Sequence, residues 1–212
     1  AVLDEENMIE VATFAQFRDA LRSNRSNVTV RLTADILDTS WTSVDRAEPI
    51  VIASYGNVII DLNGHSLGAT TEESKALLVL EDNYANDAGF ANLVIMNSAS
   101  KTGTLVNMLG NLIQLDNEKS SLTILPRVNL TVADVGESDS AVIVARNFAK
   151  LRMYDCEIKN INGYGICFDN TSARAYENSV VDTCYLTITS GNSCFSFGSG
   201  AFTMETFFRF SL

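Results

Sequence analysis

The sequence predicts an all-β fold: one right-handed, single-stranded parallel β-helix of about six rungs, closed at its N-terminal end by an α-helix. Three observations predict it. A short motif of alternating apolar residues recurs along the chain, a second alternating motif recurs between its copies, and one amphipathic segment precedes them all. The 212 residues are 46% apolar and 19% charged, which suits a packed interior. We expect a single domain, residues 1–212.

The first element is a predicted cap helix over residues 13–24. Thr13 and Gln16 have the spacing of a capping box, in which two side chains satisfy free N–H groups of the first helical turn. Apolar residues then share one helical face: Phe14, Phe17 and Leu21. The first rung of a solenoid exposes its apolar interior, so a helix at this position is expected to cover it.

The rungs are predicted over residues 27–199. The anchor residues of the first motif recur with a step of about 29 residues through the second half of the chain, too long for hexapeptide or nonapeptide β-helices. They are Val28, Val58, Leu93, Leu122, Leu151 and Val180. Alternation around each anchor is typical of a strand with one buried face. Three short strands and three turns fit a repeat of this length.

The second motif ends in an asparagine in three of its four copies. Its copies are Ile113-x-Leu115-x-Asn117, Ile143-x-Ala145-x-Asn147, Ile166-x-Phe168-x-Asn170 and Phe195-x-Phe197-x-Ser199. We expect Asn117, Asn147 and Asn170 to stack as a structural ladder, each amide bonding its neighbours in the adjacent rungs.

The apolar tail, residues 200–212, follows the last rung. It contains Phe202, Phe207, Phe208 and Phe210. Two interpretations stay open: a strand folded over the last rung, or an assembly surface that another protein chain covers.

The formal net charge of −11 argues against nucleic acid and anionic membrane surfaces as partners. No apolar run is long enough to span a membrane. The first residues do not resemble a signal peptide, so we expect either that a leader was removed or that the product is almost complete.

Four cysteines lie in the last third of the chain: Cys156, Cys167, Cys184 and Cys194. We favour buried apolar thiols over disulfides, and Cys156 and Cys184, about one repeat apart, are candidates to stack. The single histidine, His65, makes a zinc site improbable, and it is expected to cap a turn rather than to catalyse. We therefore expect no metal or other cofactor, with opportunistic calcium binding by acidic turns as the only alternative.

The turn Asp61-Leu62-Asn63-Gly64-His65-Ser66-Leu67 follows the cap and the first strands. With it, residues 11–67 resemble the pectate-lyase-like β-helix superfamily, in its bacterial surface and phage structural types. The resemblance implies a fold rather than an activity, because members include lyases, hydrolases, adhesins and virion spikes. In its lyases, acidic residues hold calcium and a basic residue removes a proton from a uronate.

Asp116, Arg146 and Asp169 each precede one of the three asparagines, so the repeat predicts an acid–base–acid row on the outer face. The row resembles a lyase site. We favour the simpler interpretation, a solvated ladder of opposite charges on neighbouring strands.

Trp41 and Tyr84, in predicted turns, are candidate sugar-binding aromatics, although such residues more often fold back onto the solenoid wall.

The sequence thus favours a non-enzymatic structural or adhesive module outside the cell or on a virion surface, with phage decoration, fibre or tail components preferred. It would assemble with other protein chains through its ends and contact glycans. The alternatives are a polysaccharide lyase or hydrolase acting on an acidic glycan, and a bacterial cell-surface adhesin domain.

Overall fold

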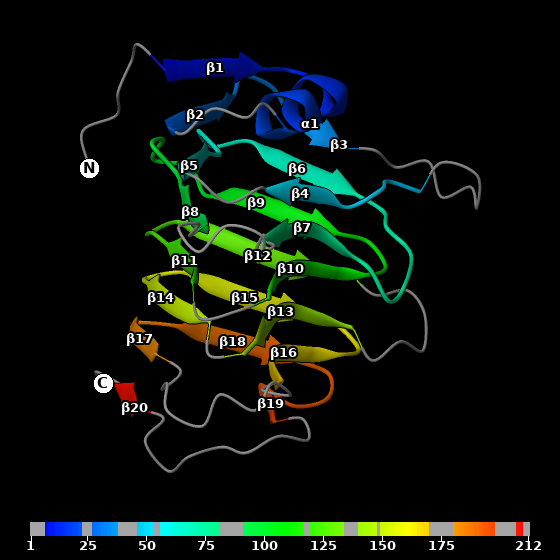
Figure 1. Cartoon of the computed structure of the whole chain (residues 1–212), viewed down its shortest axis with the longest axis vertical. Coiled ribbons are helices and arrows are strands. Elements are labelled where there is room, and N and C mark those ends of the chain that lie inside the picture. Colours follow the sequence, from blue (N-terminus) through cyan, green and yellow to red (C-terminus); the bar gives the residue numbers. More distant parts are fainter. Residues whose placement is uncertain are drawn as a thin grey trace.

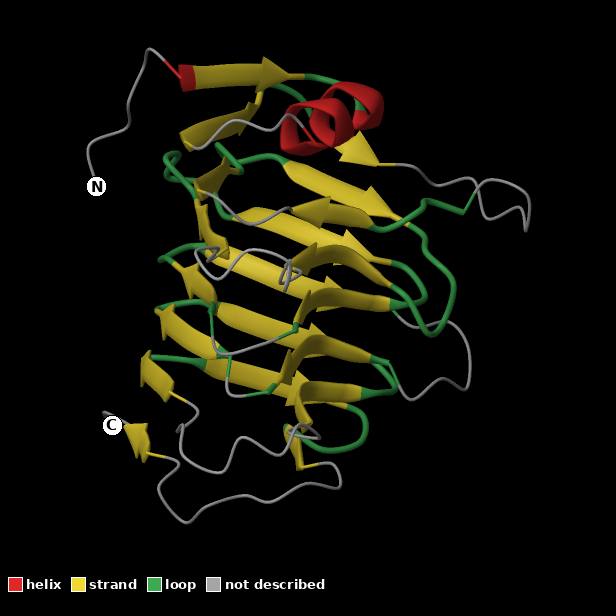
Figure 2. Ribbon diagram, viewed as in Figure 1, coloured by secondary structure: helices red, strands yellow, loops and turns green. Residues whose placement is uncertain are grey.

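Alternating apolar residues build one strand after another into three parallel sheets (Figures 1 and 2). The computed structural model describes residues 7–22, 27–37, 46–52, 56–80, 91–116, 119–133, 140–147, 149–169, 180–197 and 207–209. Within these residues the protein is all-β, with one short helix.

Sheet A contains, in spatial order, β1 (Met8–Val11), β2 (Asn27–Leu32), β5 (Gly56–Asp61), β8 (Ala91–Met96), β11 (Ser120–Ile124), β14 (Lys150–Tyr154), β17 (Val180–Cys184) and β20 (Phe207–Arg209). Sheet B contains β3 (Ile36–Leu37), β6 (Ser66–Ala69), β9 (Gly103–Asn107), β12 (Val128–Val132), β15 (Glu157–Asn160) and β18 (Thr187–Ser190). Sheet C contains β4 (Ile50–Ile52), β7 (Ala76–Leu80), β10 (Asn111–Leu115), β13 (Ala141–Arg146), β16 (Tyr164–Asp169) and β19 (Phe195–Phe197).

The chain visits the three sheets in a fixed order. From β2 to β19, each strand of sheet A is followed by one of sheet B and one of sheet C, and the chain then returns to sheet A beside the strand it left. This order of parallel strands is compatible with a parallel β-helix.

The pairing register confirms most of the predicted repeat. Val28, Val58, Leu93, Leu122 and Leu151 follow one another as partners in sheet A. In sheet C, a second column runs through Ile113, Ile143, Ile166 and Phe195.

The last anchor was wrong by one position. Leu151 pairs with Val181, and Val180 pairs with Lys150. The step from Leu151 to Val181 is 30 residues rather than the predicted 29, and it keeps an apolar residue beside Leu151.

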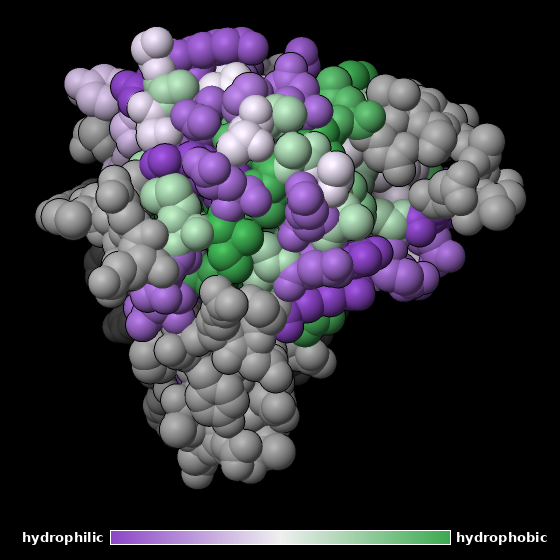
Figure 3. All heavy atoms as spheres, turned by 90° about the horizontal axis from the view of Figure 1, so that it is seen from above, coloured by the Kyte–Doolittle hydropathy of each residue, from purple (hydrophilic) through white to green (hydrophobic). Residues whose placement is uncertain are grey.

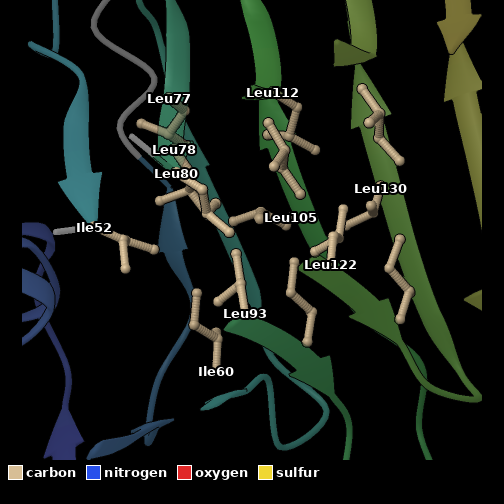
Figure 4. Packing of buried hydrophobic residues seen from close by; sticks show 14 of the residues in the cluster. Ile52, Ile60, Leu77, Leu78, Leu80, Leu93, Leu105, Leu112, Leu122 and Leu130 are labelled. Carbon is tan, nitrogen blue, oxygen red and sulfur yellow. The ribbon is translucent and has the colours of Figure 1, made fainter. Parts of the chain in front are cut away.

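The inward columns form one continuous aliphatic core between the three sheets. Ile60, Leu93 and Leu122 of sheet A are fully buried, as are Leu105 and Leu130 of sheet B (Figure 4). Burying each such side chain stabilises the fold by about 1.5–3 kcal/mol. Every rung therefore depends on its neighbours, since one rung alone cannot bury its apolar face.

The predicted cap helix is present as α1 (Phe14–Arg22), which is slightly shorter than the predicted span. The capping box also forms, because Gln16 N–H donates to Thr13 Oγ1 while Thr13 N–H donates to Gln16 Oε1, both at 3.2 Å. Phe17 and Leu21 are buried in the core and Phe14 packs against it. The helix therefore covers the N-terminal end of the apolar interior.

Strand β1, before the helix, was not predicted. Its four residues pair in parallel with β2, so sheet A extends past the first complete set of three strands. A strand of this length provides too few alternations to stand out in the sequence. Seen from this end of the molecule, hydrophilic residues lie around and across a smaller apolar area (Figure 3).

Buried asparagines hold the turns that join the sheets. Asn97, Asn107 and Asn160 are almost fully buried, and each donates to the carbonyl oxygen four residues later. The Asn107 amide also accepts from the Thr71 and Leu109 N–H groups and donates to Thr71 Oγ1. These side chains satisfy backbone groups that no strand can pair at the turns.

Asn107→Ala removes four hydrogen bonds from a buried turn and should lower the free energy of unfolding by about 3 kcal/mol. Urea unfolding followed by circular dichroism measures the loss. The control is Asn57→Ala on sheet A, an exposed asparagine whose two side-chain hydrogen bonds are also exposed to solvent, so the change should cost less than about 1 kcal/mol. Equal losses would contradict the role assigned to Asn107.

Candidate functional site

The predicted acid–base–acid row forms at the end of sheet C. Arg146 pairs in register with Asp169, and its guanidinium lies 3.7 Å from the Asp116 carboxylate and 3.9 Å from that of Asp169. Gln114 Nε2 also donates to Asp116 at 2.8 Å. All three charged side chains are partly exposed. The row therefore brings one positive charge between two negative ones at the surface.

This arrangement suits a charge ladder better than proton transfer. A charged guanidinium has no lone pair with which to accept a proton. The side chain of Arg146 is 41% exposed, so solvent screens its charge, while its Nε atom, which faces Asp169, is buried without a hydrogen bond. The geometry supports the simpler of the two interpretations of this row.

Arg146→Gln should lower the free energy of unfolding by less than about 1 kcal/mol, because the pairs are solvated. The difference from the unsubstituted protein should shrink further in about 1 M salt, where charges are screened within about 3 Å. Urea unfolding at low and high salt measures both effects, with the exposed Lys159→Gln as control. A large loss that salt does not change would contradict a solvated ladder.

The predicted asparagine ladder is described only at Asn147. Its Nδ2 donates to the carbonyl of Asp116 at 3.0 Å, and its φ of 51° places it in the left-handed region. Asn117 and Asn170 lie outside the described residues, so their stacking stays a prediction.

An amide ladder that the sequence analysis missed runs along the outer face of sheet A. Asn57 donates to Asn27 at 3.3 Å and Asn92 donates to Asn57 at 3.0 Å. The signal was present, because each of these asparagines opens one copy of the first motif.

The other predicted aromatic residues are only partly described. Trp41, Tyr84, Phe202 and Phe210 lie outside the described residues. Phe207 and Phe208 belong to β20, whose backbone pairs in parallel with β17. This part of the tail therefore forms a strand of the protein's own sheet A, while its role in assembly stays a prediction.

The turn around His65 is held by two carboxylates. The buried Asp61 accepts from Arg31 Nε at 2.9 Å and from the N–H groups of Asn63 and Ser98. Asp35 accepts from Ser66 N–H at 2.9 Å and lies 3.2 Å from His65 Nδ1. The hydrogen bond from Ser66, with a smaller contribution from His65, lowers the pKa of Asp35. The surroundings of His65 are those of a structural turn.

The cysteines differ in their surroundings. Cys156 is a buried free thiol, Cys167 is partly buried and Cys194 is exposed. Burial, aided by the charge of Asp155, raises the pKa of Cys156 to about 12. The predicted stacking of Cys156 on Cys184 was wrong, because Cys184 pairs with Tyr154. The step between these two strands is 30 residues rather than 28.

Iodoacetamide at pH 8 should therefore modify Cys194 first and spare Cys156 until the protein unfolds, because only the thiolate reacts. Mass spectrometry of the peptides measures both rates, and equal rates in the folded protein would contradict the burial of Cys156.

The raised pKa of Cys156 also predicts how the stability of the protein depends on pH. In the unfolded chain this thiol ionises near its ordinary pKa of 9.0, so stability should fall as the pH rises from there toward 12.

A groove that the sequence analysis missed lies where sheet A turns into sheet B. Its volume is about 260 Å³. The residues that line it include Arg127, Asp155 and Tyr185 from three successive turns, and Asn129, Glu157 and Thr187 from β12, β15 and β18.

The three turn residues of the groove share a backbone conformation. Arg127, Asp155 and Tyr185 have φ values of 62°, 45° and 54°, in the left-handed region that favours glycine and asparagine. Arg127 N–H donates to the Asp155 carbonyl at 3.1 Å, which stacks these turns on each other. Neither glycine nor asparagine occupies these positions, so only a weaker sequence signal of a tight turn was present, in Asp155 and in Pro126 before Arg127.

Comparison with protein-family models, curated proteins and solved structures finds no match to this chain. The described part of the chain has no group of three or more His, Cys, Asp or Glu residues placed to hold a metal ion. Of its helices, none has the length and apolar character needed to cross a membrane. The class of protein that the fold defines is an all-β chain of three parallel sheets, compatible with a parallel β-helix.

Proposed function

We propose that this chain is a non-enzymatic structural or adhesive module on an outer surface, attached through its C-terminal end. The observation that carries the proposal is the difference between the two ends of the core. At the N-terminal end, α1 and β1 cover the apolar interior. Ile9 and Phe14 are partly buried there. At the other end, where the described residues form strands and turns but no helix, Leu186, Ile188 and Phe195 pack against the core and are also only partly buried.

The loss of burial toward the C-terminal end is clearest between apolar residues that pair in register on neighbouring strands. Ile188 pairs in register with Ile158, which is fully buried, and Phe195 pairs with the fully buried Ile166. Partly exposed apolar side chains at the end of a solenoid favour contact with another surface. Because, in the described part of the chain, a helix caps only the N-terminal end, we expect two copies to pair through their C-terminal ends, or one copy to attach to a larger particle, rather than an open filament.

The same proposal includes the handedness of the fold, its number of rungs and its superfamily. We take the coil to be right-handed with six complete rungs, and the chain to be of the pectate-lyase-like type. Parallel strands joined by crossovers are right-handed in nearly all known sheets, which supports the first statement. The Asp61–Leu67 turn, held by buried and partly buried hydrogen bonds, supports the second.

Among outer-surface proteins we favour a phage decoration, fibre or tail component. Attachment by one end leaves the sides of the solenoid free, which suits a part that projects from a particle, and the net charge of −11 favours solubility. A bacterial adhesin domain is the alternative within this class.

The enzymatic alternative is a lyase or hydrolase acting on an acidic glycan, with Asp116, Arg146 and Asp169 as its residues and calcium as its metal ion. The presence of acids beside a base supports it, whereas the ion pairs of Arg146 weigh against it. Cleavage of polygalacturonate that Arg146→Gln abolishes without unfolding the protein would favour this alternative over ours.

Light scattering on a sizing column tests the attachment. The full chain should have about twice its monomer mass at micromolar concentration, and Ile188→Asp should reduce it to a monomer by placing a charge on the contact surface. Thr189→Asp is the control, because Thr189 is exposed on the outer face of the same strand and should leave the mass unchanged.

Circular dichroism of Ile188→Asp shows whether the variant keeps its β-structure, which separates lost assembly from lost folding. A full chain that stays monomeric at every concentration would remove self-association. A dimer that Ile188→Asp leaves intact would show that the contact lies elsewhere.

A further inference from the structure

The floor of the groove at the A-to-B turns is a regular column of polar side chains on sheet B. Asn129 pairs with Glu157, which pairs with Thr187, and the residues that follow each of them point into the core as Leu130, Ile158 and Ile188. Because the strands are parallel, these polar groups repeat at about 4.7–4.9 Å along the solenoid. That spacing is close to the length of one pyranose unit in an extended saccharide chain.

An exposed aromatic ring stands beside this column. Tyr185 is 71% exposed, the largest value among the exposed apolar and aromatic residues of the described part of the chain. Its left-handed backbone conformation fixes the direction in which the side chain leaves the turn. A tyrosine provides a rigid apolar face with a polar hydroxyl and loses little conformational entropy on binding.

The charges in the groove decide which ligand can enter. Asp155 and Glu157 contribute two carboxylates, and Arg127 is the single basic residue of the lining. Arg127 already donates to the carbonyl oxygens of Ala99 at 3.1 Å and Asn97 at 3.3 Å. The groove therefore offers strong acceptors for hydroxyl groups and repels anions such as uronates, phosphates and sulfates.

We propose that this groove binds a neutral oligosaccharide, with one sugar ring against Tyr185 and the hydroxyl groups of successive rings on Asp155, Asn129, Glu157 and Thr187. Carboxylates and amides accept and donate to vicinal hydroxyls, and the aromatic ring covers the apolar C–H face of a sugar. The inference deepens the adhesive part of the proposed function and rests on it. It places the ligand on the side of the solenoid, apart from the acid–base–acid row, with Tyr185 and Thr187 next to the end surface.

Titration calorimetry with the full chain tests the site. The probes are the neutral tetrasaccharides of β-1,4-linked glucose, α-1,4-linked glucose and β-1,4-linked galactose, with tetragalacturonate as the anionic counterpart. At least one neutral probe should bind, and tetragalacturonate should not. Glu157→Gln, which removes one charge from the groove, should weaken the neutral probe severalfold.

Two variants of Tyr185 isolate the ring. Tyr185→Asn removes the ring and keeps a residue that tolerates the left-handed backbone, so it should weaken binding by about tenfold or more. Tyr185→Phe keeps the ring and should stay within about threefold of the unsubstituted protein. Thr189→Ala, in the next outer column of β18, is the control on the same sheet face and should change nothing.

Several results would overturn the assignment: no heat with any neutral tetrasaccharide, preference for tetragalacturonate, or unchanged affinity in Tyr185→Asn. Each is measured separately from the light-scattering result, because Tyr185 lines the groove whereas Ile188 packs against the core. A dimer that binds no saccharide would remove the saccharide site and leave the proposed end-to-end attachment. A monomer that binds saccharide would remove the self-association and leave the saccharide site.

Discussion

The stacking of each inward apolar residue on its partner one rung away is the interaction on which the rest of the structure depends. Parallel hydrogen bonds hold successive strands side by side, and the period of two along a strand divides core from solvent. A slip of one residue would turn every apolar side chain of a strand outward. Each connection must therefore return the chain to the same register. The buried amides of the turns maintain this register, and the rows of side chains on the outer face result from it.

The turns meet this requirement with polar side chains that are themselves buried. Asn107 and Asn160 occupy comparable turns after sheet B, and each bonds to backbone groups two to four residues ahead of it. Glycines follow them where no side chain would fit: a Cβ on Gly110 or Gly163 would meet backbone carbonyl oxygens. The interior thus contains amide groups among aliphatic ones, and these amides pair with backbone groups of the turns.

A regular stack also repeats whatever the outer face carries. On sheet C it brings Arg146 between Asp116 and Asp169, where opposite charges offset one another. At the A-to-B turns it brings Arg127, Asp155 and Tyr185 into one line, where charges and an aromatic ring remain available to a ligand. The same geometry therefore produces a ladder in one place and a groove in another, and the difference lies in the side chains.

The sequence by itself determined the all-β class, the repeat, the capping box and the columns through Val28 and Ile113. These depend on local alternation and on spacing, which a single chain displays directly. It also aligned Asp116, Arg146 and Asp169, because residues at equal positions in a repeat become neighbours. Only the tertiary structure decided the last register, the short strand β1 and the groove. These depend on connection lengths and on left-handed turns built without glycine or asparagine, so the residues involved meet only after the chain has coiled.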